Sequence, residues 1–285
     1  MTWVWLNGEF LDDSLPALSA RDRGFLYGDG LFETMRAYKG RVFQFPEHMA
    51  RMAASAQFLR IPLPHASEAL EGAAQELLRR NGLEEAVVRV ALSRGSESPG
   101  LGLPDNGKPT VLVQARPFEP PPERLYRRGA DVVLASVRQN ADSPLPRHKT
   151  ANYLLYLLAR QEARDAGATD AVILNQHGQV CEATTANLFW AKGGGLGTPP
   201  VHCGLLPGVA RANVLRIAGE LGIAAEERPA SAGELFEADE IFLTNSVAEV
   251  LPVRKVDGRN IGESAPGPLT RRLTEAYRQF VSSHP

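Results

Sequence analysis

The chain has 285 residues and a net charge of −2, with 31 lysines and arginines against 33 aspartates and glutamates. This balance, without a long run of one sign, argues against a nucleic-acid-binding protein or one drawn to an acidic membrane. No stretch is apolar enough to span a bilayer, and acidic residues from Glu9 onward interrupt the start too early for a signal peptide. Cys181 and Cys203 have neither a metal-like spacing nor a disulfide framework. We therefore expect a cytoplasmic enzyme without a metal.

The first part of the chain predicts strands and two helices. WVWLNGEFL indicates a hairpin that turns at Asn7-Gly8, and LFETMRAY with RVFQF indicates a second one around Lys39-Gly40. EHMARMAASAQFLR and ASEALEGAAQELLRRNG follow as helices, and the second ends at Gly82. EAVVRVALSRG and KPTVLVQARPF are typical of strands. These elements predict a smaller α/β domain over residues 1–118.

Three consecutive prolines in EPPPERLYRRG favour a stiff, extended connection, so we predict an interdomain linker over residues 119–126. Beyond it, ADVVLAS, AVILN, GQVCEAT, NLFWAKG, IAAEERP and EIFLTN read as short strands. PGVARANVLRIAGELG begins with proline and ends with glycine, as helices commonly do. SAGELFE and the segment after Leu269 also indicate helices. Residues 127–285 are therefore predicted to form a larger C-terminal domain.

One lysine stands directly before a strongly helical run, in PRHKTANYLLYLLARQEARDAG. From Ala151 onward, Leu154, Leu155 and Leu158 recur with helical spacing. Lys149 would then meet the positive end of the helix dipole, which is unfavourable for a cation. Lys149 is either an ordinary surface lysine without a function, or its amine is held neutral by cationic neighbours and burial. A neutral amine can form Schiff bases.

Three other segments offer candidate sites, each with a plain structural alternative. Glu182 ends a strand in QVCEATTANLFW and is either a site carboxylate or the edge charge of a hairpin. The helix start at Gly208 and Val209 exposes backbone N–H groups, which bind anions. Thr244, Asn245 and Ser246 follow an apolar strand, where they either complete a phosphate cup or form a turn.

Taken together, these segments resemble the class IV pyridoxal-phosphate enzymes of fold type IV. The motifs that carry the likeness span nearly the whole chain and occur in the family's order: DRGFLYGDGLFETMRAYKG, FPEHMARM, RHKTANYL, GQVCEATTANLFW, GLLPGVAR and ADEIFLTNSVAEVLPV. The family contains branched-chain aminotransferases, D-amino acid aminotransferases and aminodeoxychorismate lyase. The resemblance implies a two-domain α/β fold, pyridoxal 5'-phosphate in the cleft between the domains, and a homodimer.

The resemblance also implies roles for single residues. Lys149, in the C-terminal domain, resembles the lysine that holds the cofactor as an internal aldimine and moves the proton. Glu182 resembles the carboxylate that pairs with the pyridine nitrogen and keeps the ring an electron acceptor. Arg51 resembles the arginine that grips the phosphate, and Leu206 the leucine under the ring. Tyr153 corresponds to a tyrosine near the phenolic oxygen, but it follows the lysine by one residue fewer than in branched-chain enzymes.

The phosphate cup is implied by the same resemblance. Gly208 and Val209 match its backbone donors, and Ser246 matches its hydroxyl. Ala210 stands where many aminotransferases of the family have threonine, and we expect Thr244 to replace the missing hydrogen bond.

Two reactions fit these residues. TNSVAEVLPV, TTANLFW and SRGSESPGLG resemble the lyase, so we favour 4-amino-4-deoxychorismate lyase, which releases 4-aminobenzoate and pyruvate. The alternative is an aminotransferase of the branched-chain or D-amino acid type, although Gly95 and Ser96 after Arg94 depart from the D-amino acid enzymes' Arg-x-His pair. A protein that binds pyridoxal phosphate without catalysis is the third reading, and retention of both Lys149 and Glu182 argues against it. The candidate substrate residues are Arg36, Thr34, Arg94 and Asn245.

Overall fold

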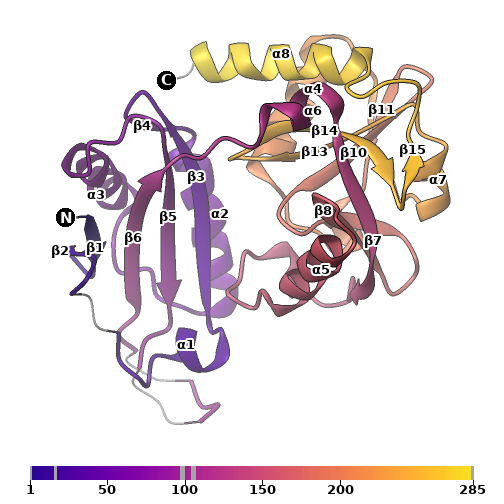
Figure 1. The fold of residues 1–285 in the computed structure, drawn as a ribbon. Coiled ribbons are helices and arrows are strands. Elements are labelled where there is room, and N and C mark those ends of the chain that lie inside the picture. Colours follow the sequence, from indigo (N-terminus) through magenta and orange to yellow (C-terminus); the bar gives the residue numbers. More distant parts are fainter. Residues whose placement is uncertain (1, 16–17, 97–99, 104–106, 284–285) are drawn as a thin grey trace. The chain divides into compact units, whose positions relative to one another are not determined.

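The computed structural model describes residues 2–15, 18–96, 100–103 and 107–283. Its fold is mixed α/β with two sheets, as predicted. The chain divides into two units by its internal contacts (Figure 1). The first unit holds Met1–Glu119 and His148–Asn152, and the second holds Pro120–Arg147 and Tyr153–Ser283. Among the described helices, none is both long and apolar enough to cross a membrane.

Six strands of the described residues form the sheet of the first unit, in the order β2-β1-β6-β5-β3-β4 and antiparallel throughout. They are β1 (Trp3–Leu6), β2 (Glu9–Asp12), β3 (Gly30–Tyr38), β4 (Arg41–Val42), β5 (Ala86–Ser93) and β6 (Thr110–Pro117). Both predicted hairpins are confirmed. Asn7-Gly8 and Lys39-Gly40 all have positive φ, as the tight turns of hairpins require. The strand predicted over RVFQF is short, because Gln44 turns into left-handed backbone and starts a helix.

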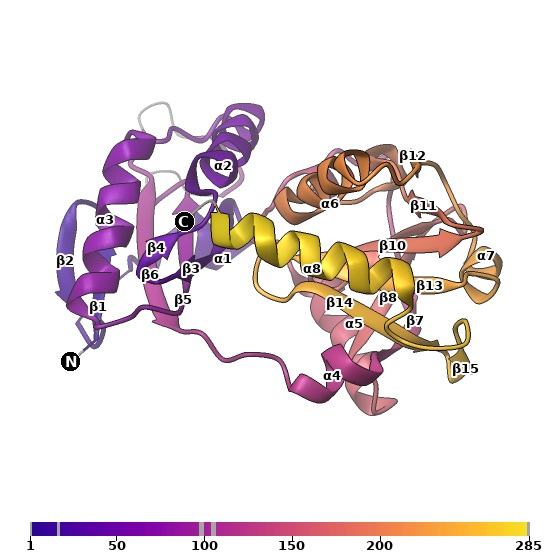
Figure 2. The ribbon, with the colours of Figure 1, turned by 90° about the horizontal axis from the view of Figure 1, so that it is seen from above.

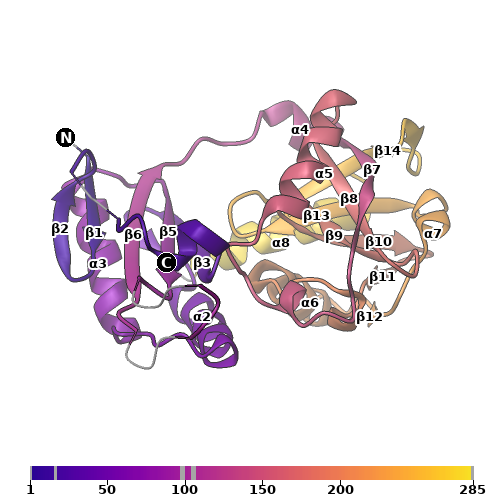
Figure 3. The same ribbon diagram turned by 90° about the horizontal axis from the view of Figure 1, so that it is seen from below.

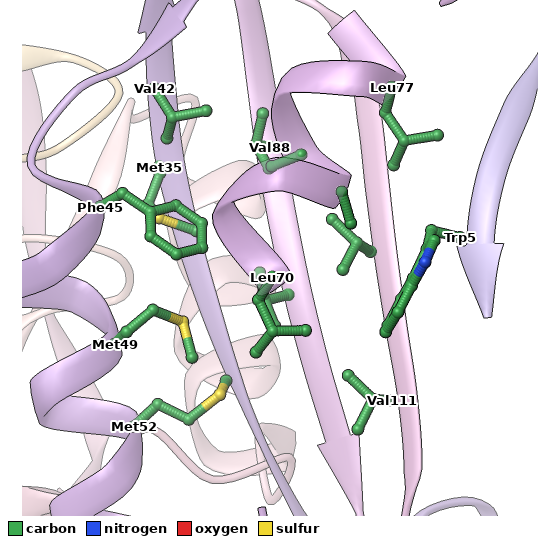
Figure 4. Packing of buried hydrophobic residues seen from close by; sticks show 14 of the residues in the cluster. Trp5, Met35, Val42, Phe45, Met49, Met52, Leu70, Leu77, Val88 and Val111 are labelled. Atoms are coloured by element: carbon green, nitrogen blue, oxygen red, sulfur yellow. The ribbon is translucent and has the colours of Figure 1, made fainter. Parts of the chain in front are cut away.

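Two long helices cover one face of this sheet: α2 (Phe45–Leu59) and α3 (Ser67–Arg80). Figure 4 shows Met49 and Met52 of α2 pointing toward the same buried cluster as Leu70 of α3 and Val88 of β5. All of these side chains are almost fully buried. Burial of a large apolar side chain contributes about 1.5–3 kcal/mol, so packing of the two helices on the sheet stabilises this unit.

A buried ion pair joins β3 to α2. Glu33 is 1% exposed, and its carboxylate accepts hydrogen bonds from Nε and Nη2 of Arg51 at 2.8 and 2.6 Å. His48, one turn earlier on α2, donates from Nδ1 to the same carboxylate at 2.7 Å. Burial acts to raise the pKa of Glu33, but the hydrogen bonds from Arg51 and His48 outweigh it and lower the pKa to about 2. The carboxylate is therefore charged and saturated with donors.

The second sheet has the order β12-β11-β10-β13-β14-β7-β8-β9 in the described residues, with β15 beside β14. Its strands are β7 (Ala130–Gln139), β8 (Asp170–Asn175), β9 (Val180–Ala183), β10 (Asn187–Lys192), β11 (Gly195–Thr198), β12 (Ala225–Glu227), β13 (Glu240–Asn245), β14 (Glu249–Val256) and β15 (Arg259–Asn260). The β14–β7, β7–β8 and β11–β12 pairs are parallel. The remaining neighbours are antiparallel.

Helices flank this sheet (Figures 2 and 3). They are α4 (Glu123–Arg128), α5 (Leu154–Asp165), α6 (Val209–Glu220), α7 (Ala232–Phe236) and α8 (Pro268–Ser283), and the first unit adds the short α1 (Arg23–Tyr27). α5 packs on β7 and β8, while α6 and α8 contact each other and strand β13. Ala171 and Ile173 of β8 face α5, and the alternating Val172 and Leu174 face a second core cluster.

The structure differs from the sequence prediction at the presumed linker. Residues 119–126 do not form one extended connection, because helix α4 begins at Glu123 directly after Pro122. Proline suits the start of a helix, where its missing N–H costs nothing. α4 is held in the second unit by Tyr126, whose hydroxyl donates to the carbonyl of Ala248 at 3.0 Å.

A second difference concerns Lys149 and the helix after it. α5 begins at Leu154 rather than at Ala151, so Lys149 is not in a first helical turn. The N–H of Phe32 donates to Lys149 O at 3.0 Å, and that of Ala151 to Gly30 O at 2.9 Å. The backbone there pairs with β3, and this pairing prevents helix formation. Residues 148–152 therefore group with the first unit, not with the predicted C-terminal domain.

The buried ion pair generates a stability prediction. Replacing Glu33 by Gln leaves the Arg51 charge without its partner in a buried place, so we expect a loss of about 3 kcal/mol in unfolding free energy at pH 7. Since the pKa of Glu33 is lowered from 4.5 to about 2, its contribution is present above pH 4.5 and is lost as the pH falls toward 2. Urea unfolding at pH 7 and at pH 3 measures both effects.

Glu76→Gln is the matched control, because Glu76 also pairs with two arginines, Arg79 and Arg80, but at the surface of α3. Water screens this pairing, and the control is expected to change stability little. Equal losses in the two variants would contradict the prediction.

Candidate functional site

The predicted site residues divide between the two units. Lys149, Arg51, Arg36, Thr34 and Arg94 lie in the first unit. The second unit holds the remaining candidates, which are Tyr153, Glu182, Leu206, Gly208, Val209, Thr244, Asn245 and Ser246.

The Lys149 side chain lies on an aromatic ring of β3. Its Nζ is 4.5 Å from the centroid of the Phe32 ring. The guanidinium of Arg89, on β5, lies 3.8 Å from the centroid of the same ring. Thr34 is directly opposite Arg89 in the β3–β5 ladder, so their side chains share one face of the sheet. The Lys149 amine and the Arg89 guanidinium therefore both contact the Phe32 ring.

Arg89 was missed by the sequence prediction. The available signal was a charged residue in the middle of the strand AVVRVALS, whose neighbouring residues are apolar. Period-2 alternation marks that position as facing away from the helix-covered core. What the sequence could not give is the pairing of β5 with β3, which places Arg89 on the ring that Lys149 also contacts.

Arg51 belongs to the buried cluster with Glu33 and His48. The two-pronged hydrogen bond to Glu33 fixes the plane of the guanidinium and the direction of its other N–H groups. Burial lowers the pKa of His48, hydrogen bonding to Glu33 opposes this, and the positive charges of Arg51 and Lys149 lower it further. Lys149 is therefore close enough to this cluster for its charge to act on it.

Arg94 and Arg36 are engaged elsewhere. The guanidinium of Arg94 donates to both carboxylate oxygens of Asp29 and to the carbonyls of Leu59 and Arg60. Arg94 is 5% exposed, so the structure does not support the prediction that it binds substrate. Its contacts instead tie the end of β5 to the end of α2.

Arg36 donates from Nη2 to Glu85 at 2.8 Å, and its guanidinium lies 3.3 Å from the centre of the Phe118 ring. These contacts give Arg36 a structural role on β3. Thr34 is half-buried two residues earlier on the same strand, and its place opposite Arg89 keeps it a candidate for the substrate side of the sheet.

Glu182 lies in β9 and is 5% exposed. Its Oε1 accepts a hydrogen bond from the hydroxyl of Tyr156 at 2.9 Å. Its Oε2 accepts from the N–H of Leu206 at 3.2 Å and from Nδ2 of Asn187 at 3.3 Å. A buried carboxylate with three such donors is stabilised in its charged form. The sequence left Glu182 as either a site carboxylate or an edge charge of a hairpin. An edge charge would be exposed to solvent, so the burial of Glu182 favours the site carboxylate.

The tyrosine that contacts Glu182 is Tyr156, which was not among the residues predicted from the sequence. Tyr153 is the residue before α5, and its ring packs on the ring of Tyr156 with centroids 4.8 Å apart. Helical spacing places Tyr156 three residues later, on the face that meets β7 and β8. The place of Tyr153 near the cofactor's phenolic oxygen stays a prediction.

The start of α6 forms a second cluster. Gly208 precedes the helix, and a Cβ at this position would lie 2.0 Å from Oδ1 of Asn187, so only glycine fits. Asn187 Nδ2 donates to the carbonyl of Leu206 at 2.9 Å. Asn187 in turn pairs with Thr244 across the β10–β13 ladder. The helix N-terminus and the end of β13 are thereby brought together.

Thr244 and its neighbours complete this region. Among the described side chains, Thr244 Oγ1 is one of few buried polar atoms without a hydrogen-bond partner, and the residue is 1% exposed. A buried hydroxyl of this kind fits a missing acceptor such as a phosphate oxygen. Asn245 instead accepts from the N–H groups of Val247 and Ala248, which makes it a turn residue rather than a substrate contact. Ser246 lies in that turn.

Known proteins resemble this chain over nearly its whole length. The model of the family amino-transferase class IV matches residues 30–256. A Methanocaldococcus jannaschii protein, provisionally named branched-chain-amino-acid aminotransferase, is 39% identical over 97% of this chain and 96% of its own length. The D-alanine aminotransferase of Bacillus licheniformis is 32% identical, over 98% of this chain and 97% of its own.

Solved structures agree with these relatives. The Escherichia coli branched-chain amino acid aminotransferase matches with a TM-score of 0.95 and 31% identity, over 99% of this chain and 95% of that one. A T.th. branched-chain amino acid aminotransferase with pyridoxamine 5'-phosphate has a TM-score of 0.93 at 33% identity, over 100% of this chain and 95% of that one. A Legionella pneumophila structure, provisionally named 4-amino-4-deoxychorismate lyase, has a TM-score of 0.86 at 26% identity, over 94% of this chain and 97% of that one.

The family match covers most of the chain, and the relatives named above as aminotransferases are matched over nearly their whole length. The family resemblance and the fold class predicted from sequence are thereby confirmed. The chain belongs to the class IV aminotransferases and is an enzyme of that family with pyridoxal 5'-phosphate as its cofactor.

Proposed function

We propose that this enzyme transfers the amino group of an L-amino acid with an apolar, branched side chain to a 2-oxo acid. The observation that carries the proposal is the shared Phe32 ring, with the Lys149 amine on it and the Arg89 guanidinium beside it. An amino acid substrate needs a base near its α-carbon and a cation for a carboxylate, and these two side chains supply both. The relatives named as branched-chain aminotransferases support the same substrate class.

Pyridoxal phosphate, when bound, supplies an aldehyde that joins an amine and a ring that accepts electron density. Lys149 is assigned as the residue that carries the cofactor and as the base that removes the α-proton of the substrate. Its carbonyl accepts a hydrogen bond from the N–H of Phe32, so the backbone that carries the side chain is fixed to β3. Rigid placement of a base lowers the entropic part of the barrier.

We assign the cofactor to the residues that match the family's binding site. Glu182 would pair with the ring nitrogen, and Leu206 would support the ring. Arg51 and the N–H groups at Gly208 and Val209 bind the phosphate, since a helix N-terminus favours an anion. The hydroxyls of Ser246 and Thr244 complete the cup, and Thr244 takes the place of the threonine that Ala210 replaces. Support for the role of Thr244 comes from its buried, unpartnered hydroxyl.

The lyase reading has weaker support. It rests on turn motifs of the sequence and on one structural neighbour at 26% identity, whereas the aminotransferases match at 31–39%. A D-amino acid aminotransferase is also less well supported. Arg94, the arginine that could bind a substrate carboxylate there, is buried and donates to Asp29 instead. A non-catalytic role would leave the charged, buried Glu182 without a function, since storage of the cofactor needs no electron acceptor.

The substrate assignment is tested on the purified holoenzyme. L-leucine, L-isoleucine, L-valine and D-alanine are each supplied with 2-oxoglutarate, and aminodeoxychorismate is supplied alone. We expect glutamate formation with the three branched-chain L-amino acids, and at most slow formation with D-alanine. Pyruvate release from aminodeoxychorismate without turnover of any amino acid would establish the lyase and refute our assignment.

The role of Lys149 gives a second prediction. Lys149→Ala is expected to lose the visible absorbance of the bound cofactor and to reduce kcat by at least about 10³-fold, because both the covalent link and the base are removed. Lys192→Ala is the control, since Lys192 is an exposed lysine that pairs with Asp239 at 3.3 Å. Substantial turnover by Lys149→Ala would remove this residue from the mechanism.

We also propose that the enzyme is a homodimer that uses helix α5. Leu154, Leu157 and Leu158 lie at helical spacing on one face and are 69%, 60% and 46% exposed. Helical spacing of leucines is typical of a face buried within the chain, but α5 packs on the sheet through Ala159 and Ala163 instead. An exposed stripe of leucines is typical of a protein–protein contact.

Sedimentation velocity tests this contact. Leu157→Glu places a charge on the leucine stripe and is expected to shift the wild-type dimer toward monomer, because a buried unpaired charge opposes association. Leu15→Glu, at a leucine that is 70% exposed in the first unit, serves as the control. A monomeric wild type, or a dimer that withstands Leu157→Glu, would contradict the proposed interface.

A further inference from the structure

We propose that Tyr156, held by Gln139, is a positioning residue that keeps Glu182 ionised and thereby keeps the proton on the cofactor's ring nitrogen. The inference rests on the proposed role of Glu182 opposite that nitrogen. It adds two residues, neither of which was among the sequence candidates.

The hydrogen bonds form a directed chain within the second unit. Gln139 Nε2 donates to the hydroxyl oxygen of Tyr156 at 2.9 Å, and that hydroxyl lies 2.9 Å from Glu182 Oε1. An ionised carboxylate only accepts hydrogen bonds, so the tyrosine's single proton points to Glu182. The amide of Gln139 occupies a lone pair of the tyrosine oxygen and holds this orientation.

The two ends of this chain of hydrogen bonds are buried, and Tyr156 between them is half-buried. Gln139 is 8% exposed and Glu182 is 5% exposed. Burial raises the pKa of Tyr156 above its ordinary value, and the negative charge of Glu182 and the hydrogen bond to it raise it further. The phenol is therefore protonated at neutral pH, where it acts as a hydrogen-bond donor.

The consequence concerns one shared proton. A carboxylate and a pyridinium in a buried place tend to neutralise each other, because burial disfavours both charges. Donors to the carboxylate oppose this transfer, since they stabilise only its charged form. Oε2 receives contacts from Leu206 and Asn187 at 3.2 and 3.3 Å. The contact from Tyr156 to Oε1, at 2.9 Å, is shorter than either and therefore stabilises the charge more.

Without the tyrosine hydroxyl, the proton leaves the ring nitrogen for Glu182. Loss of this hydrogen bond removes stabilisation from the charged form of Glu182 and leaves its neutral form unaffected, so the proton is held less firmly on the ring nitrogen. An unprotonated ring accepts electron density less well, so removal of the α-proton slows. Binding of substrate does not involve this proton, and KM is expected to change little.

Tyr156→Phe removes one oxygen atom and keeps the ring that packs on Tyr153. Tyr277→Phe is the matched control, because Tyr277 is a buried tyrosine of α8 whose hydroxyl bonds to Asn213. Glu182→Gln is the reference for complete loss of the carboxylate. Thermal melting of each variant, measured beside the wild type, reports any change in folding.

The decisive measurement is the ¹⁵N chemical shift of the ring nitrogen in holoenzyme loaded with pyridoxal phosphate that carries ¹⁵N in the ring. We expect a protonated nitrogen at pH 7 in the wild type and in Tyr277→Phe. In Tyr156→Phe the shift should move toward the unprotonated value, with kcat lowered about tenfold. The variant Gln139→Leu should move it in the same direction by less.

The outcomes separate this inference from the proposed function. If Tyr156→Phe keeps the wild-type ¹⁵N shift while Glu182→Gln loses it, Glu182 has its assigned role and the tyrosine inference is overturned. If Glu182→Gln also keeps the wild-type shift, the role of Glu182 itself fails, and the inference fails with it.

Discussion

Backbone pairing between the Lys149 segment and β3 is the constraint on which the assigned chemistry depends. The two hydrogen bonds at 3.0 and 2.9 Å and the bridge between Leu31 and Thr150 make residues 148–152 a short addition to the first sheet. They hold Lys149 on the face of β3 that carries Phe32. Because β5 pairs with β3 on its other side, Arg89 reaches the same ring. One strand therefore positions an amine from one segment and a guanidinium from another.

The two units stabilise buried charge in different ways. In the first unit, the Glu33 carboxylate is neutralised by Arg51, and the pair also fixes the guanidinium in one plane. In the second unit, Glu182 accepts hydrogen bonds from neutral donors, among them the Tyr156 hydroxyl and the N–H of Leu206. A cation cancels the charge of a buried carboxylate, whereas neutral donors stabilise that charge and preserve it. This difference agrees with a structural role for Glu33 and a ligand-facing role for Glu182.

The fold by itself does not choose the reaction. Structures named as branched-chain aminotransferase and provisionally as aminodeoxychorismate lyase both match this chain over more than nine-tenths of its length. A shared scaffold and a shared base serve both reactions, so the side chains that face the substrate decide between them. In the first unit, we propose Phe32, Thr34 and Arg89 as members of this group.

The class, the cofactor and most of the helices and strands could be predicted from the order of the residues. Turn dipeptides such as Asn7-Gly8 act locally, and the family motifs are contiguous, so both can be read along the chain. Four features emerge only from the folded chain: the tyrosine that contacts Glu182, the structural role of Arg94, the place of Arg89 beside Lys149, and the exposed leucines of α5. Each depends on which segments pair or pack across long sequence separations. A local pattern carries no record of its distant partner, and for that reason the leucines correctly predict the helix but not that it begins only at Leu154, after residues 149–151 have paired with β3.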